Sequence, residues 1–540
     1  MLPYYKKNGV NNRKMKQKNK HIKFLILSAV LLLLSGILSC STGGHEPAPE
    51  QITVPADTSA AVTAAAAPEE TLPVTVTAAE EEVYNTTAQQ TLTDAEPDTS
   101  AVEETAGNLI LSEILTEPQT APPETLPREP AELNTETLLE DFDRFIGIIE
   151  ENFPFYGTAR RKYGLDLYGQ KTAARAAVEQ LNTARQDSQI LRDFTDILSR
   201  YIITPLHSMG HMRGLWAGSQ AHEIQLALIK WDAGFEVSWY PNLYAAHLNN
   251  VFTSPAALRY YGDPLAGVDI DSYLQKVLFT PVPNNVTFDI IQPDSVAYMK
   301  IRAMNSANFY HDGELIADFG ATIGNFDHLI IDIRGNQGGS ADYFTWNVVA
   351  PLISEPASLF YYLFFKDGQH AKMFDELYYR DLQWQIANNL TLHRDAPRFP
   401  IGELLPDLPY ANADDFAELS YGIKREITVQ PSAERLAFDG KIWLLVDRLS
   451  FSASEISAAL AKESGFATLV GESTGGIFGG YTAAFIGLPN TGAIIRYDYG
   501  YATDLQGRSL EEFGVSPHIF NRPGMDALQT VLALIAEGGG

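Results

Sequence analysis

Cysteine is nearly missing from this chain of 540 residues: Cys40 stands alone, so no internal disulfide can form. Lysine and arginine are missing from residue 41 to residue 127, and no lysine follows Lys462. The chain has a formal net charge of −28 and no stripe of basic residues that could bind phosphate groups. Nucleic acid is therefore excluded as an expected partner. The glycine spacings of nucleotide-binding loops are also missing, and we expect no cofactor.

The amino terminus has the layout of a bacterial lipoprotein signal peptide. Residues 1–23 carry eight Lys/Arg and no acid, and an uncharged, mostly apolar run follows at 24–39, directly before Cys40. This predicts a signal peptide at 1–39 and a lipid anchor on Cys40. The alternative is an uncleaved signal anchor, for which the apolar run is short. In both cases we expect the protein in the cell envelope, on the extracytoplasmic side of a bacterial membrane.

The segment at 40–133 is expected to be a disordered linker. Between residues 41 and 127 there are sixteen acids, and Thr, Ala and Pro make up much of the remainder. Such a composition cannot bury enough apolar surface to offset the entropy lost on ordering. The linker would hold the globular part away from the lipid bilayer. About 410 residues remain, which is enough for two or three packed units.

A serine-rich turn at 447–456 predicts a nucleophile. It follows an apolar run of strand length at 441–446 and precedes a helical stripe of apolar residues. Ser452 would therefore lie at a helix N-terminus, where unpaired N–H groups and the helix dipole favour a developing anion. The alternative is that Ser450 or Ser452 caps this helix, as serine commonly does.

Two other segments carry residues suited to catalysis. Helical patterning from residue 134 ends near 215 in a turn that contains His207 and His211. These two histidines could hold a metal, but the glutamate of an HExxH motif is missing and no cysteine can help. Downstream, a predicted strand at 328–333 runs into the glycine-rich loop 334–340 and then a helix. Such a loop can bind phosphate or present backbone N–H groups to an oxyanion.

The order of these motifs resembles the serine peptidase family of the tail-specific (C-terminal processing) proteases and the tricorn core protease. The motifs are a Gly-His turn, Ile-Asp-Ile-Arg-Gly-Asn-Gln-Gly-Gly, Ser-Ala-Ser-Glu-Ile, Thr-Leu-Val-Gly-Glu and Leu-Glu-Glu-Phe-Gly-Val-Ser-Pro. The resemblance spans about residues 135–537. It implies cleavage of polypeptide substrates through an acyl-enzyme, and it leaves the oligomeric state open.

The resemblance also implies an architecture. The expected fold is α/β (α+β), with a helical cap at 134–215 and a crotonase-like ββα spiral as the catalytic core at 291–540. Family members often carry a PDZ-like module between cap and core. A slight match at 266–274 places a PDZ-like or β-rich module at 216–290. Residues 364–440 are a long insertion in the core, and the sequence leaves its role open.

The catalytic base is where the chain departs from part of the family. The resemblance implies, for the branch of this family with a Ser-Lys dyad, a lysine about twenty-five residues after the serine, whereas this chain has Ile477 there. The resemblance to the tricorn-like branch instead implies His211 as the base, with Glu511 orienting the imidazole. Glu512 is the fallback acid.

The remaining site residues also come from the resemblance. The oxyanion hole would consist of the N–H of Ala453 with that of Gly338 or Gly339. Some positions depart from the tricorn-like pattern: Met209 replaces an acid, Met212 a threonine and His518 an aspartate.

Two other functions stay open. Residues 471–475 satisfy the GxSxG pattern around Ser473, and Asp504 and His518 follow in the order of an α/β-hydrolase triad. A nucleophile elbow needs a helix directly after it, whereas residues 475–482 are rich in glycine and then resemble a strand. An esterase that uses Ser473 is thus one alternative. A catalytically inactive, peptide-binding lipoprotein with a peptidase fold is the other, because Met209 and Ile477 depart from the family.

Overall fold

The computed structural model describes residues 131–233, 243–387, 393–395, 397–479 and 483–538. The predicted signal peptide, Cys40 and nearly all of the predicted linker lie outside these residues. The described residues belong to one compact unit. No helix within them combines the length and the apolar character that crossing a membrane requires.

The first part of the described chain is helical, as predicted. Its helices are α4 (Thr135–Asn152), α5 (Tyr156–Tyr163), α6 (Leu167–Glu179) and α7 (Asp187–Leu198). Asn134 caps α4 through a capping box with Thr137, and the apolar stripe of α4 is buried. The chain continues from α7 through a π-turn (Ser199–Ile203) and two 3₁₀ turns (Thr204–Leu206 and Met209–His211). The second 3₁₀ turn carries His211.

The module expected at 216–290 differs from the structure. The described residues form helices α8 (Gln220–Ala233), α9 (Leu243–Phe252), α10 (Pro255–Tyr261) and α11 (Ile270–Phe279). The segment that suggested a PDZ-like match, 266–274, covers the turn before α11 and the first half of α11, where the Asp269 side chain accepts the Ser272 N–H as a helix cap. Leu274 and Leu278 are buried at helical spacing, which explains why this segment is a helix. The prediction of a PDZ-like or β-rich module is therefore wrong for these residues.

The central sheet has six strands in the order β14-β10-β9-β4-β3-β2. Their bounds are β2 (Val286–Gln292), β3 (Val296–Ile301), β4 (His328–Asp332), β9 (Lys441–Val446), β10 (Thr468–Gly471) and β14 (Ile519–Phe520). The hairpin of β2 and β3 is antiparallel, and all the other pairs are parallel. Because parallel strands end at the same edge of a sheet, the loops after β4 and β9 lie next to each other. These loops contain the glycine-rich segment and the serine turn.

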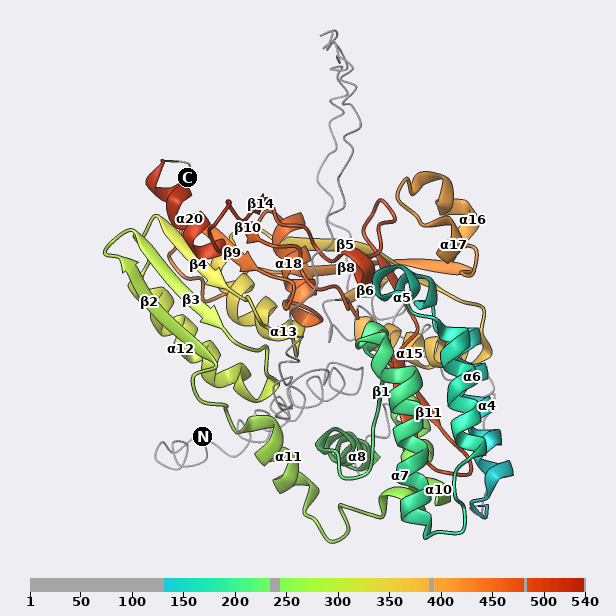
Figure 1. Cartoon of the computed structure of the whole chain (residues 1–540). Helices are drawn as coiled ribbons and strands as arrows, with labels where there is room; N and C mark the ends of the chain where they lie inside the picture. Colours follow the sequence, from blue (N-terminus) through green and yellow to red (C-terminus); the bar gives the residue numbers. More distant parts are fainter. Residues whose placement is uncertain (1–130, 234–242, 388–392, 396, 480–482, 539–540) are drawn as a thin grey trace, which may run out of the picture. The chain divides into compact units, whose positions relative to one another are not determined.

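Helices cover this sheet (Figure 1). α12 (Phe309–Thr322) packs against β2, and α18 (Ala453–Glu463) packs against β9 and β10. α20 (Ala527–Ala536) packs on β9 and β10 and buries a small separate apolar cluster with them. Shorter helical segments complete this part of the chain: η5 (Ser306–Asn308), α13 (Ala341–Phe344), η6 (Thr345–Val349), α14 (Ala350–Leu352) and α19 (Leu510–Phe513). The mixed α/β class is confirmed, while the crotonase-like spiral stays a prediction.

The described chain contains two further sheets. One has the order β1-β12-β11, with β1 (Arg213–Gly214), β11 (Ala483–Gly487) and β12 (Ile494–Asp498). The other has the order β13-β5-β8-β6, with β13 (Tyr501–Thr503), β5 (Ala357–Phe365), β8 (Tyr421–Val429) and β6 (His393–Asp395). β7 (Phe399–Pro400) also pairs with β8.

The insertion predicted at 364–440 is part of this second sheet. It contains β8, which pairs with β5 along the whole length of both strands. It also contains α15 (Gln369–Ala387), α16 (Ile401–Leu404), η7 (Leu405–Asp407) and α17 (Ala413–Phe416). The insertion thus shares the main hydrophobic core through residues such as Phe374 and Ile423.

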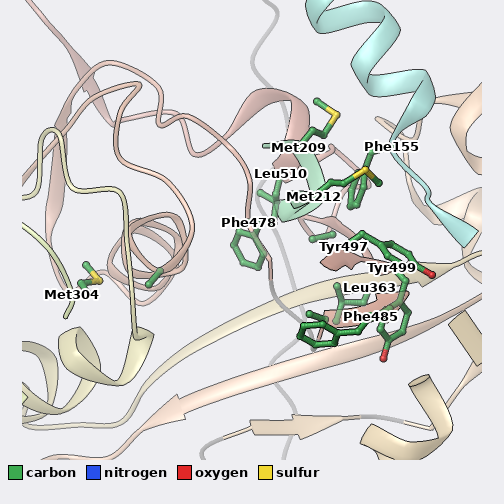
Figure 2. Close-up of a cluster of buried hydrophobic side chains, with 14 of the residues drawn as sticks. Phe155, Met209, Met212, Met304, Leu363, Phe478, Phe485, Tyr497, Tyr499 and Leu510 are labelled. Atoms are coloured by element: carbon green, nitrogen blue, oxygen red, sulfur yellow. The ribbon is translucent and has the colours of Figure 1, made fainter. Parts of the chain in front are cut away.

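Both methionines that depart from the family pattern are core residues. Met209 is 1% exposed and Met212 is 2% exposed, and both belong to the large hydrophobic cluster of the described chain. Figure 2 shows part of this cluster, in which Met209, Met212, Phe155 and Phe478 are labelled. A buried acid at position 209 would need its own hydrogen-bonding partners, whereas a methionine fills this apolar space without them.

Candidate active site

Ser452 lies on a strained turn between β9 and α18. Its φ is 60° and its ψ is −121°, which is a conformation that residues other than glycine rarely adopt. Although Ser452 is the N-cap residue of α18, its side chain makes no capping hydrogen bond. Ser450 instead stabilises the turn: its hydroxyl accepts the Asp447 N–H at 3.2 Å and donates to the Ile333 carbonyl at 2.9 Å. The strained turn therefore directs the Ser452 hydroxyl away from the helix, which is typical of functional sites.

The Ser452 hydroxyl faces a histidine and, through it, an aspartate. Its Oγ is 3.0 Å from Nε2 of His211. On the other side of the imidazole, Nδ1 lies 2.6 Å from Oδ2 of Asp498. All three residues are at least 93% buried. The distances and the order of the groups are those of a serine–histidine–acid triad.

Strand pairing explains why His211 meets Asp498. β1 begins two residues after His211, and β12 ends at Asp498. In this antiparallel pair Arg213 is the partner of Arg496. Extending the register by two residues places position 211 opposite position 498. The turn before it requires glycine, because a Cβ on Gly210 would lie 2.6 Å from the Phe153 ring and the φ of Gly210 is +56°.

The environment of His211 favours a neutral imidazole. Burial lowers the pKa of His211, and the charges of Arg496 and Arg213 lower it further, while Asp498 acts in the opposite direction. A neutral ring whose Nδ1–H donates to Asp498 has its Nε2 lone pair free to accept the Ser452 proton. This is the state that a general base needs.

Glu511, which was predicted to orient the imidazole, lies elsewhere. Its carboxylate accepts the backbone N–H of Gly210 at 2.6 Å and that of Phe478 at 3.0 Å. Glu512, the fallback acid, forms an ion pair with Arg161. Asp498 lies against the imidazole of His211 instead, because it is the last residue of β12. The sequence reasoning missed Asp498, for which the only signal was its place at the end of an apolar strand.

The predicted oxyanion loop lies directly against the serine turn. A Cβ on Gly338 would be 2.9 Å from Cβ of Ser452 and 2.8 Å from the backbone nitrogen of Ala453. Gly338 has a φ of +94°, so glycine is required at this position. The Gly338 N–H already donates to the Asn336 side chain at 2.9 Å. Among the predicted donors, those of Ala453 and Gly339 are therefore the better candidates for an oxyanion.

The position of the dyad lysine has a backbone role here. Ile477 has a φ of 58°, and its carbonyl accepts the N–H of Ser452 at 3.1 Å. Lys462 lies in the last turn of α18, and its ammonium donates to the Ser516 carbonyl at 2.9 Å. Within the described residues, neither position 477 nor Lys462 therefore offers Ser452 a lysine base.

The alternative triad around Ser473 is not assembled. The Ser473 hydroxyl contacts that of Ser516 at 3.4 Å. Nδ1 of His518 accepts the Leu469 N–H at 2.9 Å, and Asp504 closes its own turn by accepting the backbone N–H of Arg508. The three side chains thus have separate partners.

His207 does not join His211 in a metal site. Its ring packs against that of Tyr163, with 4.4 Å between the ring centroids. Within the residues that the structure describes, no group of three or more potential ligands is placed to hold a metal ion.

Comparison with known proteins gives a family for the second half of the chain. Residues 295–520 match peptidase family S41. The match contains Ser452, Asp498 and Glu511, whereas His211 and the N-terminal helices precede it. No curated protein matches the chain.

Several solved structures are similar at low identity. A structure of mature CPAF in complex with lactacystin is 14% identical, covers 75% of this chain and 97% of its own, and has a TM-score of 0.40. The photosystem II D1 C-terminal processing protease is 13% identical, with 74% and 96% covered and a TM-score of 0.33. A candidate peptidase from Parabacteroides merdae is 15% identical, with 75% and 96% covered and a TM-score of 0.40.

Proposed function

Because residues 295–520 of this chain are a serine peptidase region of family S41, which hydrolyses peptide bonds, we propose that it cleaves polypeptides with a Ser452–His211–Asp498 triad. The observation that carries the proposal is the contact of Ser452 Oγ with His211 Nε2 at 3.0 Å, on a strained and buried turn. The base comes from the helical part of the chain and the nucleophile from the matched region.

The geometry supports a two-step reaction. His211 Nε2 takes the proton from Ser452 Oγ while this oxygen attacks the carbonyl carbon of the peptide bond. His211 then gives the proton to the departing amine, which leaves an acyl-ester on Ser452. A water molecule releases the acyl group with His211 again as the base. Asp498 holds the ring with Nδ1–H toward itself and stabilises the imidazolium that forms in each step.

The negative oxygen of each tetrahedral intermediate needs hydrogen-bond donors. The N–H of Ala453 is at the start of α18, where backbone N–H groups have no partner within the helix and the dipole is positive. The Gly339 N–H comes from the glycine-rich loop 334–340, which packs against the serine turn. We assign these two groups to the oxyanion hole.

The inactive alternative is less well supported by the geometry. A strained serine costs free energy, and a binding protein would have no use for a hydroxyl aligned with a histidine and an aspartate. A fluorophosphonate probe tests this directly, because it reacts with an activated serine. We expect labelling and peptide hydrolysis by the wild type, both lost in Ser452→Ala and both retained in Ser473→Ala. A folded wild type that resists the probe would support the binding protein.

We also propose that the enzyme is anchored to the extracytoplasmic side of a bacterial membrane through lipid on Cys40. The support is the sequence alone: a basic segment, an apolar run and a single cysteine behind it. One acyl chain binds a bilayer only marginally, so stable anchoring needs at least a second one. Expression of Cys40→Ala tests the proposal. We expect loss of processing and release from the membrane fraction, and unchanged fractionation would refute the anchor.

A further inference from the structure

Glu511 lies at the junction of the two segments that carry the base and the nucleophile. One of its oxygens accepts the N–H of Gly210, the residue before His211, at 2.6 Å. The other accepts the N–H of Phe478 at 3.0 Å. The residue before Phe478 is Ile477, whose carbonyl accepts the N–H of Ser452 at 3.1 Å. A single buried carboxylate therefore links the backbone next to the base with the backbone that holds the nucleophile.

The segment that Glu511 holds has further supports of the same kind. Glu455, in the first turn of α18, accepts the Gly476 N–H at 3.1 Å and is hydrogen-bonded to the Thr474 hydroxyl. Lys162 of α5 donates to the carbonyl of Gly475 at 3.0 Å and to that of Glu511 at 3.1 Å. Residues 474–478 are thus fixed from both sides.

Backbone strain shows why such supports are needed. His211, Ser452 and Ile477 have φ values of 45°, 60° and 58°, which are unfavourable for side chains of this size. Strained residues keep such conformations only when the surrounding contacts over-determine them. The two hydrogen bonds of Glu511 adjoin two of these three residues.

We propose that Glu511 is a positioning residue that sets the distance between His211 and Ser452 by binding the backbone of both segments. The role rests on the proposed function, and it leaves the orientation of the imidazole to Asp498. Glu511 touches neither the ring nor the hydroxyl through any contact described above, so it acts on catalysis through Gly210 and Phe478.

The charge of Glu511 matters for this role. The titratable groups that face it are Lys162 of α5, Asp498 of β12 and Glu455 of α18, and Tyr163 of α5 also lies near. Burial raises the pKa of Glu511 to about 7; Asp498 acts in the same direction, while the Gly210 and Phe478 N–H groups and Lys162 act against it. An ionised carboxylate accepts both N–H groups, whereas a protonated one presents an O–H to one of them. The link should therefore weaken as the pH falls through about 7.

The first test follows the imidazole and needs no substrate. A proton NMR resonance of the His211 Nδ1–H, identified by its absence in His211→Ala, should persist in Glu511→Gln and disappear in Asp498→Asn. Amide hydrogen exchange at Gly210 and Phe478 should accelerate in Glu511→Gln. Loss of the resonance in Glu511→Gln would overturn the proposal, because Glu511 would then be the orienting acid.

The second test measures turnover. We expect Glu511→Gln to lower kcat roughly 10²-fold with little change in KM, as for a displaced catalytic group. The control is Glu512→Gln, the neighbouring acid that pairs with Arg161, which should match the wild type in kcat and in hydrogen exchange. A folded Glu511→Gln with kcat within about twofold of the wild type would refute the role.

Two further measurements keep the test decisive. If Glu511→Gln does not fold, Lys162→Met removes the cation facing Glu511, and the midpoint of the acid limb of kcat/KM should move to higher pH. An unchanged midpoint would overturn the proposal. If the wild type hydrolyses no peptide, the proposed function fails. The rate of fluorophosphonate labelling and the exchange of the two amides still test the positioning role.

Discussion

Replacing Asp498 by asparagine is the change that best separates this triad from the one the family resemblance implied. The side chain keeps its size and loses its charge. Its Oδ2 is 2.6 Å from Nδ1 of His211, a short distance of the kind found in charge-assisted hydrogen bonds. An amide can instead offer its NH₂ group to the ring, which favours the tautomer whose Nε2 carries the proton and cannot accept one from Ser452.

The expected loss of rate is large. In serine–histidine–aspartate enzymes this change lowers kcat by roughly 10⁴-fold, which corresponds to about 5 kcal/mol of transition-state stabilisation. We expect a loss of this order in peptide hydrolysis and in fluorophosphonate labelling. Asp504→Asn, at a half-buried aspartate that closes its own turn by accepting the Arg508 N–H, is the matched control and should retain activity.

The pH dependence of activity gives an independent test, because the direction of its shift in Asp498→Asn is expected from the structure. Burial lowers the pKa of His211 and Asp498 opposes this effect. Without Asp498 the pKa of His211 should be lower still, so the residual activity should persist to lower pH than in the wild type. Thermal unfolding must accompany the assay, because Arg496, which is 4% exposed, loses its nearby carboxylate. A folded Asp498→Asn enzyme with near-normal turnover would refute the assignment of the acid.

The remaining predictions concern the base, the oxyanion loop and stability. His211→Ala should cost several powers of ten in kcat/KM, comparable to the loss of Ser452, while Lys462→Ala should leave kcat/KM almost unchanged; equal effects would contradict the assigned base. Gly338→Ala should lower both the melting temperature and kcat, because the new Cβ would meet Phe451, Ser452 and Ala453 at 2.7 to 2.9 Å, whereas Gly402→Ala in α16, with nothing within 4 Å, should retain both. Burial raises the pKa of Glu455 from 4.5 to about 8, so the folded chain keeps a proton that the unfolded chain releases. The free energy of unfolding should therefore fall as pH rises from about 5 to 8, by at most about 1.4 kcal/mol per pH unit for this group, and urea unfolding of Glu455→Gln should show a flatter dependence.

The insertion shows one limit of reading the chain by its motifs. Residues 364–440 were expected to be a long insertion in the core, with its role left open. In the structure β8 from this range pairs with β5, and Phe374 and Ile423 enter the main core. Pairing between strands that are far apart in the sequence leaves no local pattern, so the sequence did not reveal this role.

The segment at 216–290 shows another limit. The match at 266–274 was a matter of a few residue types, whereas the helix there follows from the Asp269 cap and the buried Leu274 and Leu278. Local helix signals were present in the sequence and were outweighed by the expectation from the family. Capping and helical spacing were the better guides.

The sequence by itself was enough to predict Ser452, His211 and the glycine-rich loop as parts of the site, because each lies in a local pattern: a strand–turn–helix, a Gly-His turn and a run of glycines. Tertiary structure alone decided the acid. Asp498 and Glu511 are both buried acids, 2% to 4% exposed, and nothing local distinguishes their roles. The pairing of Arg213 with Arg496 brings Asp498 opposite His211, while α19 directs Glu511 to the N–H groups of Gly210 and Phe478. Which carboxylate meets the imidazole depends on the register between two strands about 280 residues apart, and contacts of that kind are set by packing of the whole chain rather than by neighbouring residues.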